Sequence, residues 1–143
     1  PTQHRQVAAL VHRRGISGPE ILLITSRDTG RWVIPKGWRQ KGRSRARSAL
    51  REAFEEAGIR GTVRKKAVGT YVYEKRIDKK GVTRDCLVDV FLVTFSKQEK
   101  KWPERGQRRS TWLKPGVAAR KVAEPELKIL LRSRSMFEAA GTN

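Results

Sequence analysis

The stretch from Gly37 to Ile59 reads GWRQKGRSRARSALREAFEEAGI and predicts one short amphipathic helix with defined ends. Ser44 is suited to cap the first turn with its hydroxyl, and Gly58 is suited to the left-handed conformation that ends many helices. We therefore expect the helix to run from Arg45 to Ala57. At about 100° per residue, one face gathers the apolar side chains that a core requires, namely Ala46, Ala49, Leu50, Ala53, Phe54 and Ala57.

The opposite face of the same helix carries three carboxylates within five residues, those of Glu52, Glu55 and Glu56. Like charges at these spacings repel each other, so the cluster is unfavourable unless something offsets it. A hard divalent cation held by oxygen ligands would offset it. The alternative is an ordinary acidic helix face exposed to solvent, which is the default for three glutamates taken alone.

The fixed positions of the stretch are spaced G-x5-R-x7-R-E-A-x-E-E-x-G-I, from Gly37 to Ile59. This spacing resembles the Nudix box, which is G-x5-E-x7-R-E-U-x-E-E-x-G-U with U aliphatic. One position departs from that pattern, because Arg43 stands where the family has its first glutamate. The resemblance implies an α/β/α sandwich around a central mixed sheet, formed here by a single domain over residues 1–143.

The same resemblance implies roles for the acids. It makes Glu52 and Glu56 the ligands of Mg²⁺ or Mn²⁺, helped by a backbone carbonyl near Lys36 or Gly37. Glu55 would then bind a second ion or accept the proton from the attacking water. These roles stay exchangeable, because a sequence does not show where side chains point.

Arginine is frequent at the start of the predicted helix. In the family pattern, a glutamate at position 43 can pair with the arginine that matches Arg51, and we expect Arg51 to orient the carboxylates. Here Arg43 is a cation, so that pair cannot form. Arg43, Arg45 and Arg47 all lie at or within the first turn, where the helix dipole disfavours positive charge. We therefore expect an anion nearby.

Our hypothesis is that basic residues beside the acids form an electropositive mouth for the distal phosphates of a substrate. Its predicted members are Arg27, Lys36, Lys41, Arg43 and Arg45. The alternative is that these cations are solvated or pair with acids elsewhere. Trp38 lies in the same region, and we expect it to stack on a base or to cap the cleft.

The rest of the chain predicts strands and a packing helix. Strands are expected at residues 7–12, 20–25, 31–37, 61–76, 82–95 and 109–113, a brief helical turn from Pro115 or Gly116, and a last helix from Pro125 to about Ala139. Both faces of the 82–95 strand are mostly apolar, which indicates a sheet covered on two sides. Asp89 interrupts this pattern, so we expect it to find an arginine partner, a metal ion or a sheet edge.

Composition limits the classes of ligand and compartment. Thirty-three Lys and Arg against fourteen Asp and Glu give a net charge of +19, which attracts polyanions such as RNA and densely phosphorylated small molecules. The only cysteine, Cys86, forms no internal disulfide and fits a reducing cytoplasm. No apolar run approaches the roughly 20 residues of a membrane span, so we expect no membrane partner. The oligomeric state stays open.

Further stretches resemble the diphosphoinositol polyphosphate phosphohydrolase branch of the Nudix family, namely RWVIP at 31–35, GT at 61–62, WPE at 102–104 and RSTW at 109–112. The resemblance implies a metal-dependent hydrolase of phosphoanhydrides in diphosphoinositol polyphosphates, dinucleoside polyphosphates or related nucleoside diphosphate derivatives. One alternative is an RNA 5′-end pyrophosphohydrolase, which the charge favours. Another is a catalytically impaired, basic RNA-binding module, supported only by Arg43. Acids such as Asp78, Asp85 or Glu99 could also reach the site.

Overall fold

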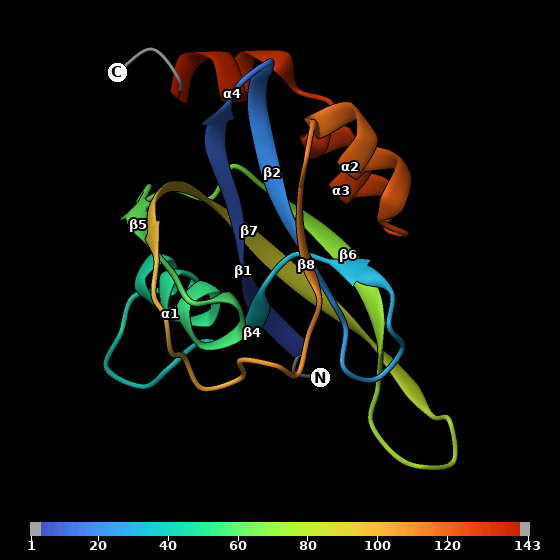
Figure 1. Ribbon diagram of the computed structural model, residues 1–143. Helices are drawn as coiled ribbons and strands as arrows, with labels where there is room; N and C mark the ends of the chain where they lie inside the picture. The colour runs from blue at the N-terminus through green and yellow to red at the C-terminus, as the bar shows by residue number, and fades with distance from the viewer. Residues whose placement is uncertain (1–3, 141–143) are drawn as a thin grey trace.

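A single mixed sheet organises the chain in the computed structural model, which describes residues 4–140. Its eight strands follow the order β3-β2-β1-β7-β5, with β4 paired to β1, β6 to β7 and β8 to β2. β1 and β7 run parallel, whereas the other pairs are antiparallel. Helix α1 lies on one face of the sheet, and α2, α3 and α4 lie on the other (Figure 1). The predicted α/β/α sandwich with a mixed sheet is confirmed.

The strands are β1 (His4–Gly15), β2 (Gly18–Thr25), β3 (Trp32–Val33), β4 (Lys36–Trp38), β5 (Ile59–Val63), β6 (Gly69–Arg76), β7 (Thr83–Gln98) and β8 (Ser110–Leu113). The helices are α1 (Arg45–Ala57), α2 (Pro115–Lys121), α3 (Pro125–Leu131) and α4 (Arg134–Ala140). In the described part of the chain, every helix is too short or too polar to span a bilayer.

Two apolar cores lie on the two faces of the sheet, and β7 contributes to both. Val88, Val90 and Leu92 pack into the core that α2, α3 and α4 complete. Phe91 and Val93, which alternate with them, pack against the buried alanines of α1. The prediction that both faces of this strand are covered is therefore confirmed, since successive side chains of a strand point to opposite faces.

Helix α1 has the predicted ends. The Ser44 hydroxyl accepts a hydrogen bond from the Arg47 N–H at 3.1 Å. Gly58 has φ 74°, and its N–H donates to the Ala53 and Phe54 carbonyls. The short side chains Ala46, Ala49, Ala53 and Ala57 are buried, which brings the helix axis close to the sheet.

Two predicted strands are each divided in the structure. The expected 61–76 strand is β5 and β6, which pair with successive parts of β7. The charged stretch from Arg64 to Val68 between them leaves the ladder, although Arg64 N–H still donates to Leu92 O and Val68 N–H to Val90 O. The expected 31–37 strand is β3 on β2 and β4 on β1. It is interrupted at Pro35, which has no N–H to donate.

The predicted last helix is also two helices. α3 ends in a tightened turn, in which the Arg132 N–H donates to Ile129 O and the Ser133 N–H to Leu130 O. The chain restarts as α4 at Arg134. The apolar side chains of both helices nevertheless belong to the core: Leu127, Leu131 and Phe137 are buried, and Leu130 packs against the same core.

Candidate functional site

The acidic face of α1 lies against the backbone of β4. A Cβ atom on Gly37 would come within 2.3 Å of Glu52 Oε1, so the Glu52 carboxylate occupies the space that any other residue would fill. Glu56 Oε1 accepts a hydrogen bond from the Lys36 backbone N–H at 3.2 Å. The α1 acids therefore lie beside the Lys36–Gly37 backbone, where the family resemblance predicts carbonyl ligands.

The three helix carboxylates lie next to one another. Gln40 Nε2 donates to Glu52 Oε2 at 3.4 Å and to Glu55 Oε1 at 3.2 Å. The Gln40 backbone is fixed in turn, because its N–H donates to Ser48 Oγ at 2.9 Å. Glu52 is also a neighbour of Glu56, because its charge adds to the raised pKa of Glu56. The predicted clustering of the three acids on one helix face is therefore present.

A fourth carboxylate, that of Glu104, joins the cluster from the loop before β8. Arg108 Nε donates to Glu104 Oε1 at 2.9 Å, and Arg108 NH2 lies 3.5 Å from Glu56 Oε2. The Arg108 side chain is only 11% exposed, and its NH1 donates to Thr25 O at 3.1 Å. The Glu104 N–H donates to Glu55 O at 3.0 Å, which holds the loop on α1. We call Glu52, Glu55, Glu56 and Glu104 the carboxylate site.

The sequence alone does not mark Glu104 as a site residue. Glu104 stands within the WPE stretch at 102–104, whereas Asp78, Asp85 and Glu99 were the acids outside the helix expected to reach the site. Asp78 instead closes the β6–β7 turn by accepting from the Lys80 and Val82 N–H groups. Glu99 pairs with Lys97 at 3.2 Å. The available signal for Glu104 was its place four residues before Arg108, but only tertiary packing shows that both reach Glu56.

Burial sets the electrostatics of the carboxylate site. Loss of solvent raises the pKa of Glu56 to about 8; Arg108 opposes this rise, and the neighbouring Glu52 and Glu104 add to it. Burial also raises the pKa of Glu52, and the charge of Glu55 adds to that rise. With a pKa of about 8, Glu56 is therefore largely protonated at neutral pH when no cation is bound.

The donor set suits a hard divalent ion, because four carboxylates and adjacent backbone carbonyls offer oxygen ligands. In the described residues, no three His, Cys, Asp or Glu side chains are already arranged around one metal position. Arg108 and Gln40 occupy the space between the acids instead. An entering cation would take over the charge compensation that Arg108 now supplies to Glu56.

Arg51 contacts one acid of the site. Its Nε lies 3.7 Å from Glu55 Oε2, and its guanidinium lies 4.9 Å from the centre of the Phe54 ring. Arg43 lies in the turn before α1, where its carbonyl accepts from Arg39 Nε at 3.1 Å and its side chain is exposed. The catalytic role of Arg51 and the substrate-binding role of Arg43 stay predictions.

The members of the predicted electropositive mouth are divided among several places. Arg27 NH1 donates to Gln107 Oε1 at 2.7 Å, and Arg27 Nε lies 3.8 Å from Glu104. Arg45 pairs with Asp89 at 2.8 Å, so the predicted arginine partner of Asp89 is found. Lys41 is exposed in the same turn as Arg43. This separation follows from the acids available to each arginine, which the sequence does not place.

Lys36 and Trp38 lie on the sheet face opposite α1. They are directly across from Ala8 and Gln6 on β1, and Ala8 belongs to the core under α2, α3 and α4. Lys36 Nζ lies 4.8 Å above the centre of the Tyr73 ring, and burial lowers the pKa of Lys36.

Trp38 is 47% exposed. Its ring meets the His4 ring edge-on, with centroids 5.7 Å apart, and the Lys75 ammonium lies 5.8 Å from the Trp38 ring centre. We call these residues the aromatic–basic surface: His4, Lys36, Trp38, Tyr73 and Lys75. It borders β4 on one face of the sheet, while the carboxylate site borders β4 on the other.

A mixed sheet between helices, with a run of acids on the helix after β4, defines a Nudix-type domain. The NUDIX domain profile matches residues 2–133. The chain therefore belongs to the Nudix family, as the sequence resemblance predicted.

Curated relatives share part of their length with this chain. It is 33% identical over 98 residues to the mitochondrial Nudix hydrolase 12 of Arabidopsis thaliana, covering 66% of this chain and 47% of that protein. It is 29% identical over 117 residues to the mouse diphosphoinositol polyphosphate phosphohydrolase 3-alpha, covering 80% of this chain and 66% of that protein. The chain spans about half the length of the first curated relatives it matches.

Solved structures share the fold over nearly the whole chain. A Caenorhabditis elegans Ap4A hydrolase binary complex has a TM-score of 0.69 at 23% identity, covering 96% of this chain and 98% of that one. The NUDIX domain of Shewanella oneidensis NrtR, complexed with ADP ribose, has a TM-score of 0.68 at 15% identity, covering 95% and 88%. At these identities, the likeness supports the architecture alone.

Proposed function

We propose that the chain is a divalent-metal-dependent pyrophosphohydrolase that cleaves phosphoanhydride bonds in polyphosphorylated small molecules. The candidate substrates are diphosphoinositol polyphosphates, dinucleoside polyphosphates and related nucleoside diphosphate derivatives. The observation that carries the proposal is the juxtaposition of four carboxylates, from Glu52, Glu55, Glu56 and Glu104, on a chain of net charge +19. Such a chain attracts a dense anion, and the acids can hold the cation that its hydrolysis requires.

The carboxylate site supplies the ligands in this proposal. Glu52, Glu56 and Glu104 would hold Mg²⁺ or Mn²⁺, together with a backbone carbonyl of Lys36 or Gly37. When bound, such an ion neutralises the anhydride oxygens and lowers the pKa of a nearby water. Metal ligation requires ionised carboxylates, so Glu52 and Glu56, whose pKa values burial raises, would release protons as the ion binds.

Glu55 would accept the proton from the attacking water, because it is the acid of the cluster that faces both Gln40 and Arg51. The water oxygen would form the new bond to phosphorus as the bridging P–O bond breaks, and the bond electrons would leave with the departing phosphate. Gln40 and Arg51 would hold the Glu55 carboxylate in place. Glu52 and Glu55 remain interchangeable as proton acceptor in this scheme.

Substrate would lie across β4, with its anhydride at the carboxylate site and its remaining groups on the aromatic–basic surface. Trp38 offers an exposed ring for stacking, and Lys36 and Lys75 offer positive charge. We propose Arg27, Lys41 and Arg43 as further phosphate ligands, whereas Arg45, which was predicted with them, pairs with Asp89 instead. The activities for which the mouse relative and the C. elegans Ap4A hydrolase are named fall within this substrate class.

RNA is the second candidate substrate. An exposed tryptophan flanked by lysine suits single-stranded RNA, and the charge of +19 favours any nucleic acid. In that case the chain would remove pyrophosphate from an RNA 5′ end. A binding module without catalysis is the third candidate, and Arg43 is the observation in its favour.

The test is a phosphate-release screen with Mg²⁺ or Mn²⁺ on three substrates: a diphosphoinositol polyphosphate, a dinucleoside polyphosphate and a 5′-triphosphate RNA. Glu56→Gln is the control, because it keeps the shape of the side chain and removes its charge. Release from the small molecules but not from RNA supports the proposal. Phosphate release from RNA alone selects the second candidate. Tight RNA binding without phosphate release from any of the three substrates selects the third.

We also propose that residues 1–143 form one Nudix domain that acts in the cytoplasm. The profile match over residues 2–133 supports the first point, and the lone, buried Cys86 supports the second. Because some relatives are named as mitochondrial or chloroplastic proteins, imaging of the tagged protein in its own cells is the measurement that decides the compartment.

A further inference from the structure

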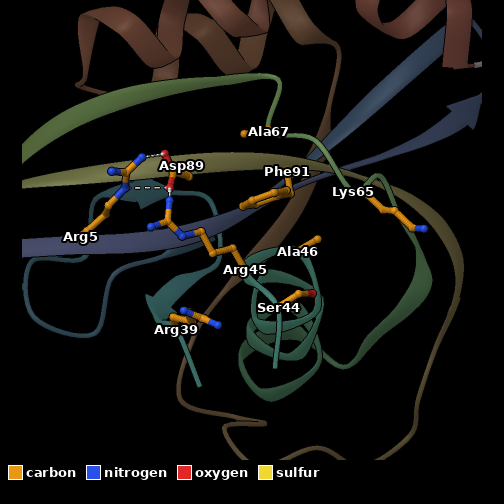
Figure 2. A pocket seen from close by; sticks show the side chains of 9 residues that line it. All are labelled: Arg5, Arg39, Ser44, Arg45, Ala46, Lys65, Ala67, Asp89 and Phe91. Carbon is orange, nitrogen blue, oxygen red and sulfur yellow. Dashed lines mark hydrogen bonds and ion pairs between the residues drawn. The ribbon is translucent and has the colours of Figure 1, made fainter. Parts of the chain in front are cut away.

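An open cavity of about 490 Å³ lies between the start of α1 and the sheet (Figure 2). Its charged lining residues are Arg5, Arg39, Arg45, Lys65 and Asp89. Four cations therefore surround a single acid. None of these residues belongs to the carboxylate site or to the aromatic–basic surface. We call this cavity the arginine pocket.

Asp89 anchors two of the arginines. Arg5 Nε donates to Asp89 Oδ2 at 3.0 Å, and Arg5 NH2 donates to Oδ1 at 3.1 Å. Arg45 NH1 donates to the same Oδ2 at 2.8 Å. The Asp89 side chain is only 5% exposed, so the protein itself satisfies this carboxylate. Asp89 thus fixes the two guanidinium groups, as Figure 2 shows.

The pocket keeps an excess of positive charge. The single negative charge of Asp89 balances only one of the two guanidinium groups that bind it. The Arg5 and Arg45 side chains are 45% and 46% exposed, so their remaining N–H groups are accessible. Arg39 adds a third guanidinium to the lining and is drawn below Arg45 in Figure 2. Lys65 extends away from this group, so we place it at the rim.

The start of α1 adds to the same field. Its first turn contains no acidic residue. The Ser44 hydroxyl binds the Arg47 N–H, and among the described contacts the Arg45 and Ala46 N–H groups have no acceptor. Ser44 and Ala46 both line the pocket. The positive end of the helix dipole and several arginines therefore meet there, which is unfavourable without an anion.

We propose that the arginine pocket is a second binding site, which takes the phosphoryl groups of a small polyphosphorylated anion. Guanidinium groups bind phosphate oxygens through paired N–H donors, and the buried Asp89 holds two of them in fixed orientations. A volume of about 490 Å³ is in the range of small-molecule sites and accommodates several phosphoryl groups. The site requires no hydrolysis and no metal ion, so it stands apart from the proposed enzymatic function.

The test is isothermal titration of sodium tripolyphosphate into the protein in EDTA, so that no metal ion links the probe to the carboxylates. Arg45→Gln should weaken binding by about tenfold or more, the effect of losing a charge-assisted hydrogen bond. Arg47→Gln is the matched control, because Arg47 is exposed in the same helical turn but does not line the pocket. It should change binding by less than about twofold.

Three further results decide the proposal. If Arg45→Gln lowers the melting temperature, Arg39→Gln takes its place, since Arg39 forms no ion pair in the described residues. Equal losses of affinity in Arg45→Gln and Arg47→Gln would show that the probe responds only to the overall positive charge, and would overturn the site. A tenfold or larger change of affinity in Glu56→Gln, in either direction, would place the probe at the carboxylates and overturn it too. Arg45-dependent binding of single-stranded RNA, without binding of tripolyphosphate, would overturn the small-anion assignment.

Discussion

Gly37 determines how closely the α1 acids approach the sheet. The position has no side chain, and the Glu52 carboxylate fills that space against the β4 backbone. A larger residue at this position would meet the flexible end of Glu52 rather than a rigid wall. The structural effect of a substitution would therefore fall on the carboxylate site and not on the core.

Gly37→Ala should lower metal-dependent kcat/KM by at least about tenfold, because Glu52 is displaced from its position as a ligand. The melting temperature should change little. Phosphate release and thermal unfolding of the same preparation check both parts. Gly116→Ala is the control, because a Cβ there meets nothing within 4 Å. Unchanged kcat/KM in Gly37→Ala would contradict the placement of Glu52 at the active centre.

Glu56 makes the stability of the metal-free protein depend on pH. Its pKa is raised from 4.5 to about 8 in the folded protein, chiefly by burial. Between these values the folded state binds more protons than the unfolded state, so the free energy of unfolding falls as pH rises, and levels off above about 8. Urea unfolding in EDTA at several pH values measures this slope. Glu56→Gln should flatten it, and a slope that survives the substitution would assign the effect to other groups.

At the scale of elements, the ends of α1 depend on local chemistry. Gly58 combines two constraints, since its φ of 74° favours glycine and a Cβ would come within 2.3 Å of the Trp102 ring. Gly42, at φ 81°, has the first constraint without the second. Comparing alanine substitutions at Gly58 and Gly42 therefore separates the cost of backbone strain from the cost of the clash with Trp102.

Gly58→Ala should destabilise the protein by about 1–3 kcal/mol more than Gly42→Ala, because the added methyl group forces Trp102 to move. The difference in free energy of unfolding between the two variants, measured with urea, tests this. Equal losses would mean that the Trp102 ring moves aside at little cost. A loss of about 1–2 kcal/mol in each is the expected contribution of the left-handed backbone alone.

Local signals explain which elements could be predicted. Ser44 and Gly58 placed both ends of α1 correctly, because a cap acts within one turn. The divisions at Arg64–Val68 and at Arg132–Ser133 were missed, since strand pairing and packing outside the segment decide them. The apolar residues on both faces of β7 predicted two cores, because alternation along a strand is likewise a local signal.

The residues of the candidate site were also predictable only where the signal is local. The helix acids follow from spacing alone, so Glu52, Glu55 and Glu56 were identified together. Glu104 was not, because it reaches the cluster only through Arg108 and the fold of its loop. The basic residues were grouped by their closeness in sequence, whereas the structure places Lys36 over Tyr73 and Arg45 on Asp89.

At the scale of the whole molecule, the net charge of +19 governs encounters with anions. KM for a polyphosphorylated substrate should rise severalfold between about 50 mM and about 200 mM salt, while kcat changes little, because screening weakens attraction and not chemistry. Steady-state kinetics over this range test the expectation, with potassium glutamate replacing chloride as the control for anion competition. A KM that is independent of salt would contradict a dominant role of the field.

The parallel pairing of β1 with β7 also sets an order for biosynthesis. His12 and Thr94, which bond across this pair, are 82 residues apart in the chain. At about 5–20 residues per second, a ribosome needs roughly 4–16 seconds to deliver the second strand after the first. During that interval β1 can pair with β2 and β4, but the cores on both faces of the sheet lack the side chains that β7 contributes. A nascent chain stalled before β7 should therefore bind chaperones, and it should acquire no metal ion until β7 is released.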